Sequence, residues 1–200
     1  MKQLTQQHML AKAILIASEG HLEVMDKGGK AYILHPIQVM YNLNTEDPEL
    51  KQIAILHDVI EDCIKFLMIK KFCETMSLEE ASEKANKLLF NLSQEEKVGF
   101  ALEILTSWGF SKRVTSALKL MTKLSTDKGE EGYFNYITRM FDNIDAIRVK
   151  LADIRHNTDI LRMKGLTDKD FARNRKYCIA FNMLTKRLAE LCIPSCIGVQ

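Results

Sequence analysis

The stretch "AILHDVIEDC" occupies residues 54–63 and combines an apolar run with four polar side chains. One imidazole and three carboxylic acids, His57, Asp58, Glu61 and Asp62, lie within two turns of a possible helix. A protein core accepts such groups only when they are paired or bind a cation. In a helix, His57 and Glu61 would share one row of side chains, and Asp58 and Asp62 the next. This stretch therefore predicts a helix that carries a functional site.

The rest of the chain extends this helical pattern. Apolar residues recur three or four positions apart, for example at Val114, Leu118 and Met121, whereas the alternation typical of strands is scarce. Only 3 prolines and 9 glycines interrupt the 200 residues. We therefore predict an all-α helical bundle that forms one domain over residues 1–200. Within it, residues 64–96 form a distinct segment of two helices, rich in Lys and Glu.

Residues that cap helices or favour their first turn mark four expected helix starts. They are Pro36 (with the helix starting just after His35), Pro48, Ser77 with Glu80, and Thr167 or Asp168.

Composition narrows the class of protein. The formal net charge is +2, from 28 Lys and Arg against 26 Asp and Glu, so bulk binding to nucleic acid is not expected. The 5 cysteines are odd in number and irregularly spaced, which favours reduced thiols. We find neither a signal peptide nor an apolar run long enough to span a membrane, and expect a soluble, cytoplasmic protein. The oligomeric state is left open.

A metal ion would solve the burial problem of the opening stretch. Besides His57 and Asp58, the chain offers His35 in "YILHPIQVM" and Asp153 in "VKLADIRHNTDIL", both among apolar neighbours. This mixed nitrogen and oxygen set suits Mn²⁺, Fe²⁺ or Zn²⁺, with octahedral positions left for water and substrate. A single buried histidine is usually a hydrogen-bonded core residue, so the prediction depends on the combination. His156 is a weaker ligand candidate, expected near the site as a hydrogen-bond partner.

Four segments together resemble the HD phosphohydrolase superfamily, specifically the hydrolase domain of RelA/SpoT homologues. They are "DKGGKAYILHPIQVM", "AILHDVIEDC", "LKLMTKLSTDKGEEGYFNYITRM" and "RVKLADIRHNTDILR", in the family order. With "RNRKYCIAFNML" they cover most of the chain outside residues 64–96. Among these homologues, the stand-alone small alarmone hydrolases are the most similar.

The resemblance implies metal-dependent hydrolysis of a small-molecule nucleotide, the removal of the 3′-pyrophosphate of (p)ppGpp to give GDP or GTP. It implies that His35, His57, Asp58 and Asp153 hold the metal, usually Mn²⁺. Glu61 and Asp62 match the acidic pair that positions and activates the attacking water; either can take the proton or hold the water in line.

The resemblance also implies substrate contacts. Asn157 matches a residue that contacts the ribose or phosphate region, and Lys27 matches a basic residue at the pocket mouth. Other candidates for balancing the substrate's phosphates are Lys30, Lys123, Arg139 and Arg155.

Two departures from the family pattern leave alternatives open. Asp26 stands where the family commonly has an arginine that stacks on guanine, so another nucleotide is a candidate substrate. Residues 64–96 replace a shorter connection and, because they leave directly from the acidic pair, could form a lid or reshape the pocket. The alternatives are a 3′-phosphatase acting on another nucleotide such as NADPH, or a catalytically silent HD module that binds nucleotide or a partner.

Overall fold

A computed structural model describes residues 5–162 and 165–193, and the regular elements of this part of the chain are helices joined by loops, as predicted. Its helices are α1 (Gln6–Gly20), α2 (Leu34–Asn42), α3 (Pro48–Leu56), α4 (Val59–Asp62), α5 (Ile64–Phe72), α6 (Leu78–Asn91), α7 (Gln94–Ser107), α8 (Lys112–Met121), α9 (Gly129–Thr138), α10 (Ile144–Asn157), the 3₁₀-helix η1 (Ile160–Arg162) and α11 (Asp168–Cys192). The described residues contain no β-strand, only an isolated bridge between Met25 and Ala31. None of the described helices is both long and apolar enough to cross a membrane.

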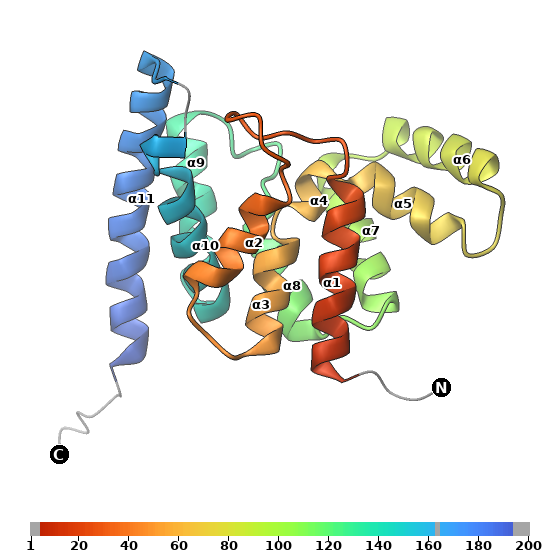
Figure 1. Cartoon of the computed structure of the whole chain (residues 1–200), viewed down its shortest axis with the longest axis horizontal. Coiled ribbons are helices and arrows are strands. Elements are labelled where there is room, and N and C mark those ends of the chain that lie inside the picture. Colours follow the sequence, from red (N-terminus) through yellow and green to blue (C-terminus); the bar gives the residue numbers. More distant parts are fainter. Residues whose placement is uncertain (1–4, 163–164, 194–200) are drawn as a thin grey trace.

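Helix α3 lies at the centre of the molecule and packs against α1, α2, α8 and α10 (Figure 1). Its Leu50, Ile53, Ile55 and Leu56 are fully buried. Because neighbours cover the second half of α3, residues 53–56 are apolar on every face instead of along one stripe. The "AIL" run before His57 is fully buried in the core.

The helix starts follow the predicted caps closely. Asp47 caps α3 by accepting the N–H groups of Glu49 and Leu50, with Pro48 as its first residue. Capping boxes open α6 at Ser77 and α11 at Thr167, as expected. Helix α2 begins at Leu34 instead of just after His35. Pro36 still falls in the first turn, where a missing N–H loses no bond within the helix.

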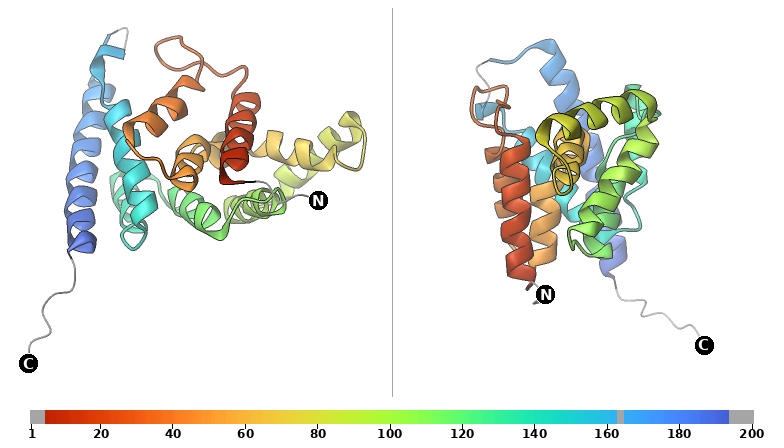
Figure 2. Two further views of the ribbon diagram at one scale, coloured as in Figure 1. Left: turned by 60° about the horizontal axis from the view of Figure 1, so that its bottom comes forward. Right: turned by 90° about the vertical axis from the view of Figure 1, so that its right-hand side faces the viewer.

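Residues 64–96 contain α5, α6 and the start of α7. Helix α5 buries Leu67 and Met68, and α6 packs against it through Ala81 and Ala85. Both helices lie at the end of the molecule opposite α11, and the view along the long axis shows α5 between α1 and α7 (Figures 1 and 2). Residues 64–96 therefore contain two complete helices and the first residues of a third, and the pair α5 and α6 packs on the core far from α10 and α11 (Figure 1).

Four of the cysteines, Cys63, Cys73, Cys178 and Cys192, are free thiols. The fifth, Cys196, lies outside the described residues.

Candidate metal centre

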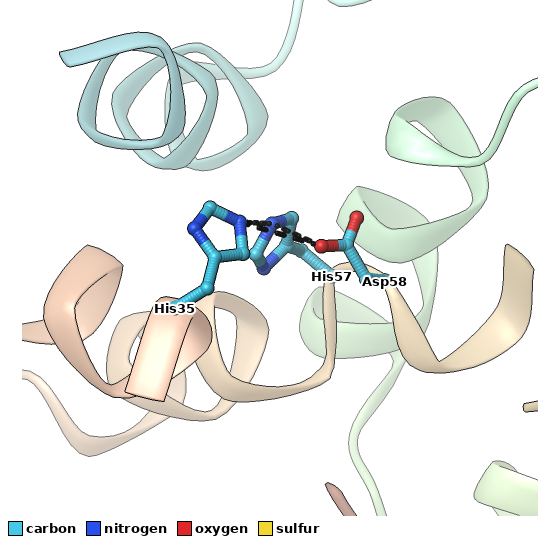
Figure 3. A group of neighbouring side chains, drawn as sticks. All are labelled: His35, His57 and Asp58. Atoms are coloured by element: carbon cyan, nitrogen blue, oxygen red, sulfur yellow. Dashed lines mark hydrogen bonds and ion pairs between the residues drawn. The ribbon is translucent and has the colours of Figure 1, made fainter. Parts of the chain in front are cut away.

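His57 and Asp58 lie in a turn between two helices. Helix α3 ends at Leu56 and α4 starts at Val59, so the single helix considered from the spacing is interrupted at these two residues. The His57 ring nitrogen Nδ1 lies 2.7 Å from the carbonyl oxygen of Ala54, the acceptor that the Asp58 N–H would use in a continuous helix. The turn points both side chains toward His35 on α2 (Figure 3).

Four side chains from three parts of the chain converge here. His35 Nε2 lies 3.3 Å from His57 Nε2, 3.4 Å from Asp58 Oδ2 and 3.2 Å from Asp153 Oδ1. His57 Nε2 lies 3.1 Å from Asp58 Oδ2 and 3.7 Å from Asp153 Oδ1. The structure thus brings together the four residues that were predicted from scattered segments. We call His35, His57, Asp58 and Asp153 the metal centre.

These distances fit a single bound cation. With ligand bonds of about 2.1 Å, neighbouring donor atoms are about 3.0 Å apart in an octahedron and about 3.4 Å apart in a tetrahedron. The observed spacings of 3.1–3.7 Å begin just above the octahedral value and extend slightly past the tetrahedral one. His35, His57 and Asp58 have donor atoms that all lie within 4.8 Å of one another, so this group of three could hold a metal ion. Asp153 lies outside that group but contacts both histidine rings. Two imidazole and two carboxylate donors suit a borderline divalent ion such as Mn²⁺ or Zn²⁺.

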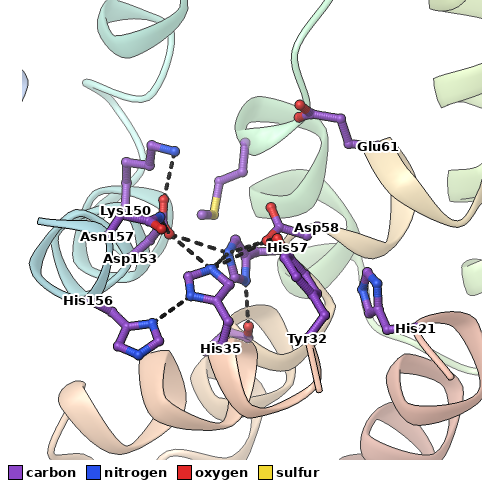
Figure 4. A network of polar contacts seen from close by, with 12 residues as sticks. His21, Tyr32, His35, His57, Asp58, Glu61, Lys150, Asp153, His156 and Asn157 are labelled. Carbon is purple, nitrogen blue, oxygen red and sulfur yellow. Dashed lines mark hydrogen bonds and ion pairs between the residues drawn. The ribbon is translucent and has the colours of Figure 1, made fainter. Parts of the chain in front are cut away.

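Neighbouring groups orient both histidine rings. If the His57 Nδ1–H donates to Ala54, the lone pair of Nε2 faces the other donors. His35 Nδ1 lies 2.6 Å from Nδ1 of His156, and the two rings stack at 4.9 Å (Figure 4). His156 therefore lies behind His35 as a hydrogen-bond partner, the role that its position in the sequence indicated.

The two carboxylates are also held from outside the metal centre. The Tyr32 hydroxyl donates to Asp58 Oδ2 at 2.6 Å. On α10, the Lys150 ammonium group binds Asp153 Oδ2 at 2.8 Å, and the Asn157 amide donates to Oδ1 (Figure 4). Lys150 is only 7% exposed, so this ion pair is buried. These contacts fix the carboxylates before any cation is bound.

The charges of the centre favour a positive group at its middle. Burial opposes protonation of His57, but the charges of Asp58 and Asp153 outweigh it and raise the pKa of His57 to about 10. Burial likewise opposes ionisation of the carboxyls, but His57 keeps the pKa of Asp58 well below its usual range, and Lys150 does the same for Asp153. Both carboxylates therefore stay charged, as metal ligands must.

Glu61 and Asp62, the acidic pair that follows Asp58 in the sequence, lie in two different environments. Glu61 accepts a hydrogen bond from the Lys123 ammonium group at 2.7 Å and from the Lys123 N–H at 3.2 Å. Its carboxylate thus points away from His57 (Figure 4). Asp62 is exposed, and partial desolvation together with the charges of Asp58 and Glu61 raises its pKa to about 6.

Two cavities open beside the metal centre. The first, of about 220 Å³, we call the His35 cavity; besides His35 its lining includes Tyr32, Asn157, Lys27 and Arg173. The second, of about 830 Å³, lies between α2 and α10 and is lined by residues that include Arg155 and Lys30. No residue of the 64–96 segment lines either cavity. The 64–96 segment, which the sequence offered as a possible lid, therefore does not cover either cavity.

The predicted substrate contacts fall into two groups. Lys27, Asn157 and Arg155 line these cavities, as does Lys30. Lys123 and Arg139 do not. Arg139 makes a bidentate ion pair with Asp127, with both hydrogen bonds at 2.7 Å. Its role in this structure is therefore to hold Asp127, not to line a cavity.

Sequence reasoning missed three residues that shape the site: Tyr32, Lys150 and Arg173. Lys150 carries a signal that could have been used, since a lysine three residues before Asp153 lies on the same helix face. Tyr32 and Arg173 reach the site across loops, and local spacing does not predict such contacts.

No protein-family model matches the chain. The similarity to the HD superfamily therefore remains a prediction from the four motifs.

Proposed function

We propose that this chain is a metal-dependent phosphohydrolase of the HD type that acts on a nucleotide. The observation that carries the proposal is the convergence of His35, His57, Asp58 and Asp153, with five donor–donor distances of 3.1–3.7 Å. When bound, a divalent cation supplies Lewis-acid activation of water and of a phosphoryl oxygen.

The chain's own residues supply the remaining chemistry. Asp62 takes the proton of the attacking water, the role that its place in the acidic pair of the motif implies. Lys123 holds Glu61 in a fixed orientation beside it. Water adds to the phosphorus next to the ribose 3′ oxygen, the bond between them breaks, and the 3′ oxygen takes up a proton as pyrophosphate leaves.

We infer that the substrate is (p)ppGpp, on the strength of the four motifs and of the His35 cavity. Lys27 and Arg173, both paired with Asp170, line that cavity beside the amide of Asn157, together with the carboxylates of Asp26 and Asp159. Cations and amide donors of this kind match the phosphates and ribose of a nucleotide. A 3′-pyrophosphate would then lie between these groups and the metal centre.

One observation favours a second candidate, removal of a phosphate from another nucleotide. The Asp26 carboxylate accepts the N–H groups of Gly28 and Lys30, both at 2.8 Å, and so closes a tight turn at the cavity edge. This side chain cannot stack on guanine as the family's arginine does. NADPH is a suitable probe, although its phosphate is on the 2′ oxygen, so the general reaction is hydrolysis of a ribose phosphate monoester.

A panel of nucleotides incubated with the protein and Mn²⁺ separates these candidates. The proposal expects pyrophosphate release from ppGpp that EDTA abolishes and that Asp58→Ala removes. Release of orthophosphate from NADPH, without pyrophosphate from ppGpp, would favour the second candidate. Nucleotide binding without turnover in any divalent metal would refute both and indicate a silent binding module. Lys119→Gln, an exposed change on α8, serves as the control.

A further inference from the structure

A third cavity, of about 360 Å³, lies at the start of α11 beside α9. We call it the α11 cavity. Its lining is almost entirely charged and consists of Glu130, Lys169, Ala172, Arg173, Arg175 and Lys176. Four cations face a single carboxylate, so the cavity carries an excess of positive charge.

Most of this charge has no counterpart among the residues that the structure describes. Within residues 5–162 and 165–193, no carboxylate lies at ion-pair distance from Lys169, Arg175 or Lys176. The Lys176 ammonium group lies over the Tyr133 ring, 4.4 Å from its centre, and not against an acid. By contrast, Asp170 pairs with Lys27 at the rim of the His35 cavity and with Arg173 in the α11 cavity. Unneutralised cations in a concave site attract an anion.

The α11 cavity is joined to the metal centre through one residue. Arg173 lines both the α11 cavity and the His35 cavity. Lys169, Arg173 and Lys176 are spaced by four and three residues, so they lie on one face of α11 over a length of about 10 Å. A ligand that fills the His35 cavity can therefore continue past Arg173 along a row of cations.

We propose that the α11 cavity binds the 5′ phosphate chain of the nucleotide whose 3′ phosphates lie at the metal centre. The inference rests on the proposed function, and it assigns a binding site to the 5′ phosphates of that substrate. Lys169 and Arg175 contact the far phosphates, and Arg173 marks the passage from nucleoside to phosphate chain. Guanidinium and ammonium groups suit this role because they form charge-assisted hydrogen bonds to phosphate oxygens.

Binding to metal-free protein in EDTA tests the inference without depending on turnover. The probes are ppGpp, guanosine 3′-diphosphate without 5′ phosphates, and inorganic tripolyphosphate. Because the first two share a base and a 3′ end, their affinity ratio isolates the 5′ chain. The variant K169Q/R175Q removes two exposed charges. Lys186→Gln is the matched control, because Lys186 is also exposed and lies on α11 about 15 Å beyond Lys176.

Each exposed charge contact contributes up to about fivefold in affinity, so K169Q/R175Q should weaken ppGpp binding roughly tenfold. The affinity of the variant for guanosine 3′-diphosphate should equal that of the wild-type protein, and Lys186→Gln should change neither affinity. The loss of ppGpp affinity in K169Q/R175Q should shrink at high salt. Equal affinities of the wild-type protein for the two nucleotides would overturn the inference, and so would an equal loss for both in the variant. Tripolyphosphate that binds without competing with ppGpp would show a separate anion site and would also overturn it.

Turnover distinguishes failure of this inference from failure of the proposed function. If Mn²⁺ supports no hydrolysis but the 5′ phosphates still strengthen binding through Lys169 and Arg175, the reaction is refuted and the α11 cavity assignment stands. If hydrolysis proceeds with the same kcat/KM for both nucleotides, the reaction stands and the assignment is refuted.

Discussion

Replacing Lys150 with methionine tests how the charges of the metal centre are balanced. The Lys150 ammonium group is buried 2.8 Å from Asp153 Oδ2 and lies 5.3 Å from the centre of the Tyr136 ring. Methionine retains an unbranched apolar chain of adaptable shape but removes the charge. Asp153 then keeps a buried carboxylate oxygen without its cation.

Removing one partner of a buried ion pair costs about 3–5 kcal/mol. For a chain of this size, a loss of 1 kcal/mol lowers Tm by about 2–4 °C, so Lys150→Met should lower Tm by about 6–20 °C in EDTA. Saturating Mn²⁺ should reduce this difference in Tm, because the cation restores positive charge beside Asp153. Asp153→Asn should remove much of the cost of the lysine substitution, with a coupling free energy of about 2 kcal/mol.

Thermal and urea unfolding followed by circular dichroism measure these quantities. Lys119→Met on α8 is the control, since this lysine is exposed and its change should shift the free energy of unfolding by no more than about 0.5 kcal/mol. The reasoning is refuted if Lys150→Met unfolds in EDTA within about 1 kcal/mol of the wild-type protein. Strict additivity with Asp153→Asn would refute it as well.

Three further predictions concern the surroundings of the site. Tyr32→Phe removes the hydroxyl that binds Asp58 at 2.6 Å, and should weaken Mn²⁺ binding about tenfold in calorimetric titration; unchanged affinity would show that the contact does not position the ligand. Asp62→Asn should leave Mn²⁺ affinity intact but lower turnover at least about 100-fold, and a fully active variant would exclude Asp62 as the base. Burial opposes ionisation of Asp127, but its ion pair with Arg139 lowers its pKa below the unfolded value of about 3.9. The stability from this pair is therefore present above about pH 4 and lost as pH falls below it. Urea unfolding at several pH values should show a shallower acid dependence in Asp127→Asn, and an identical one would contradict this.

The helical fold and most helix starts could be predicted because they depend on local rules. Apolar spacing gave the fold class, and Asp47, Ser77 and Thr167 cap helices through side chains that bond backbone groups two or three residues away. The turn at His57 and Asp58 was not predicted. It depends on the His57 ring taking the carbonyl of Ala54, which competes with the helix hydrogen bond.

The residues of the candidate site likewise divide into those that local sequence predicts and those that depend on tertiary packing. The four donor residues were found because each lies in an apolar frame, where a titratable group needs a partner. Lys123 was placed among the substrate contacts, yet it binds Glu61, since pairing between α4 and the segment after α8 depends on tertiary packing. Arg173 was missed because α11 follows a loop that gives no information on its approach to His35. Contacts between distant segments are the part that single-sequence patterns do not contain.

Titration of metal-free protein with Mn²⁺, followed by electron paramagnetic resonance of the free ion, tests the central claim most directly. The account predicts one Mn²⁺ bound per chain in the wild-type protein. Asp58→Ala should abolish binding while circular dichroism shows that the helices are retained. Absence of Mn²⁺ binding in the wild-type protein, or unchanged binding in folded Asp58→Ala, would contradict a metal centre formed by His35, His57, Asp58 and Asp153.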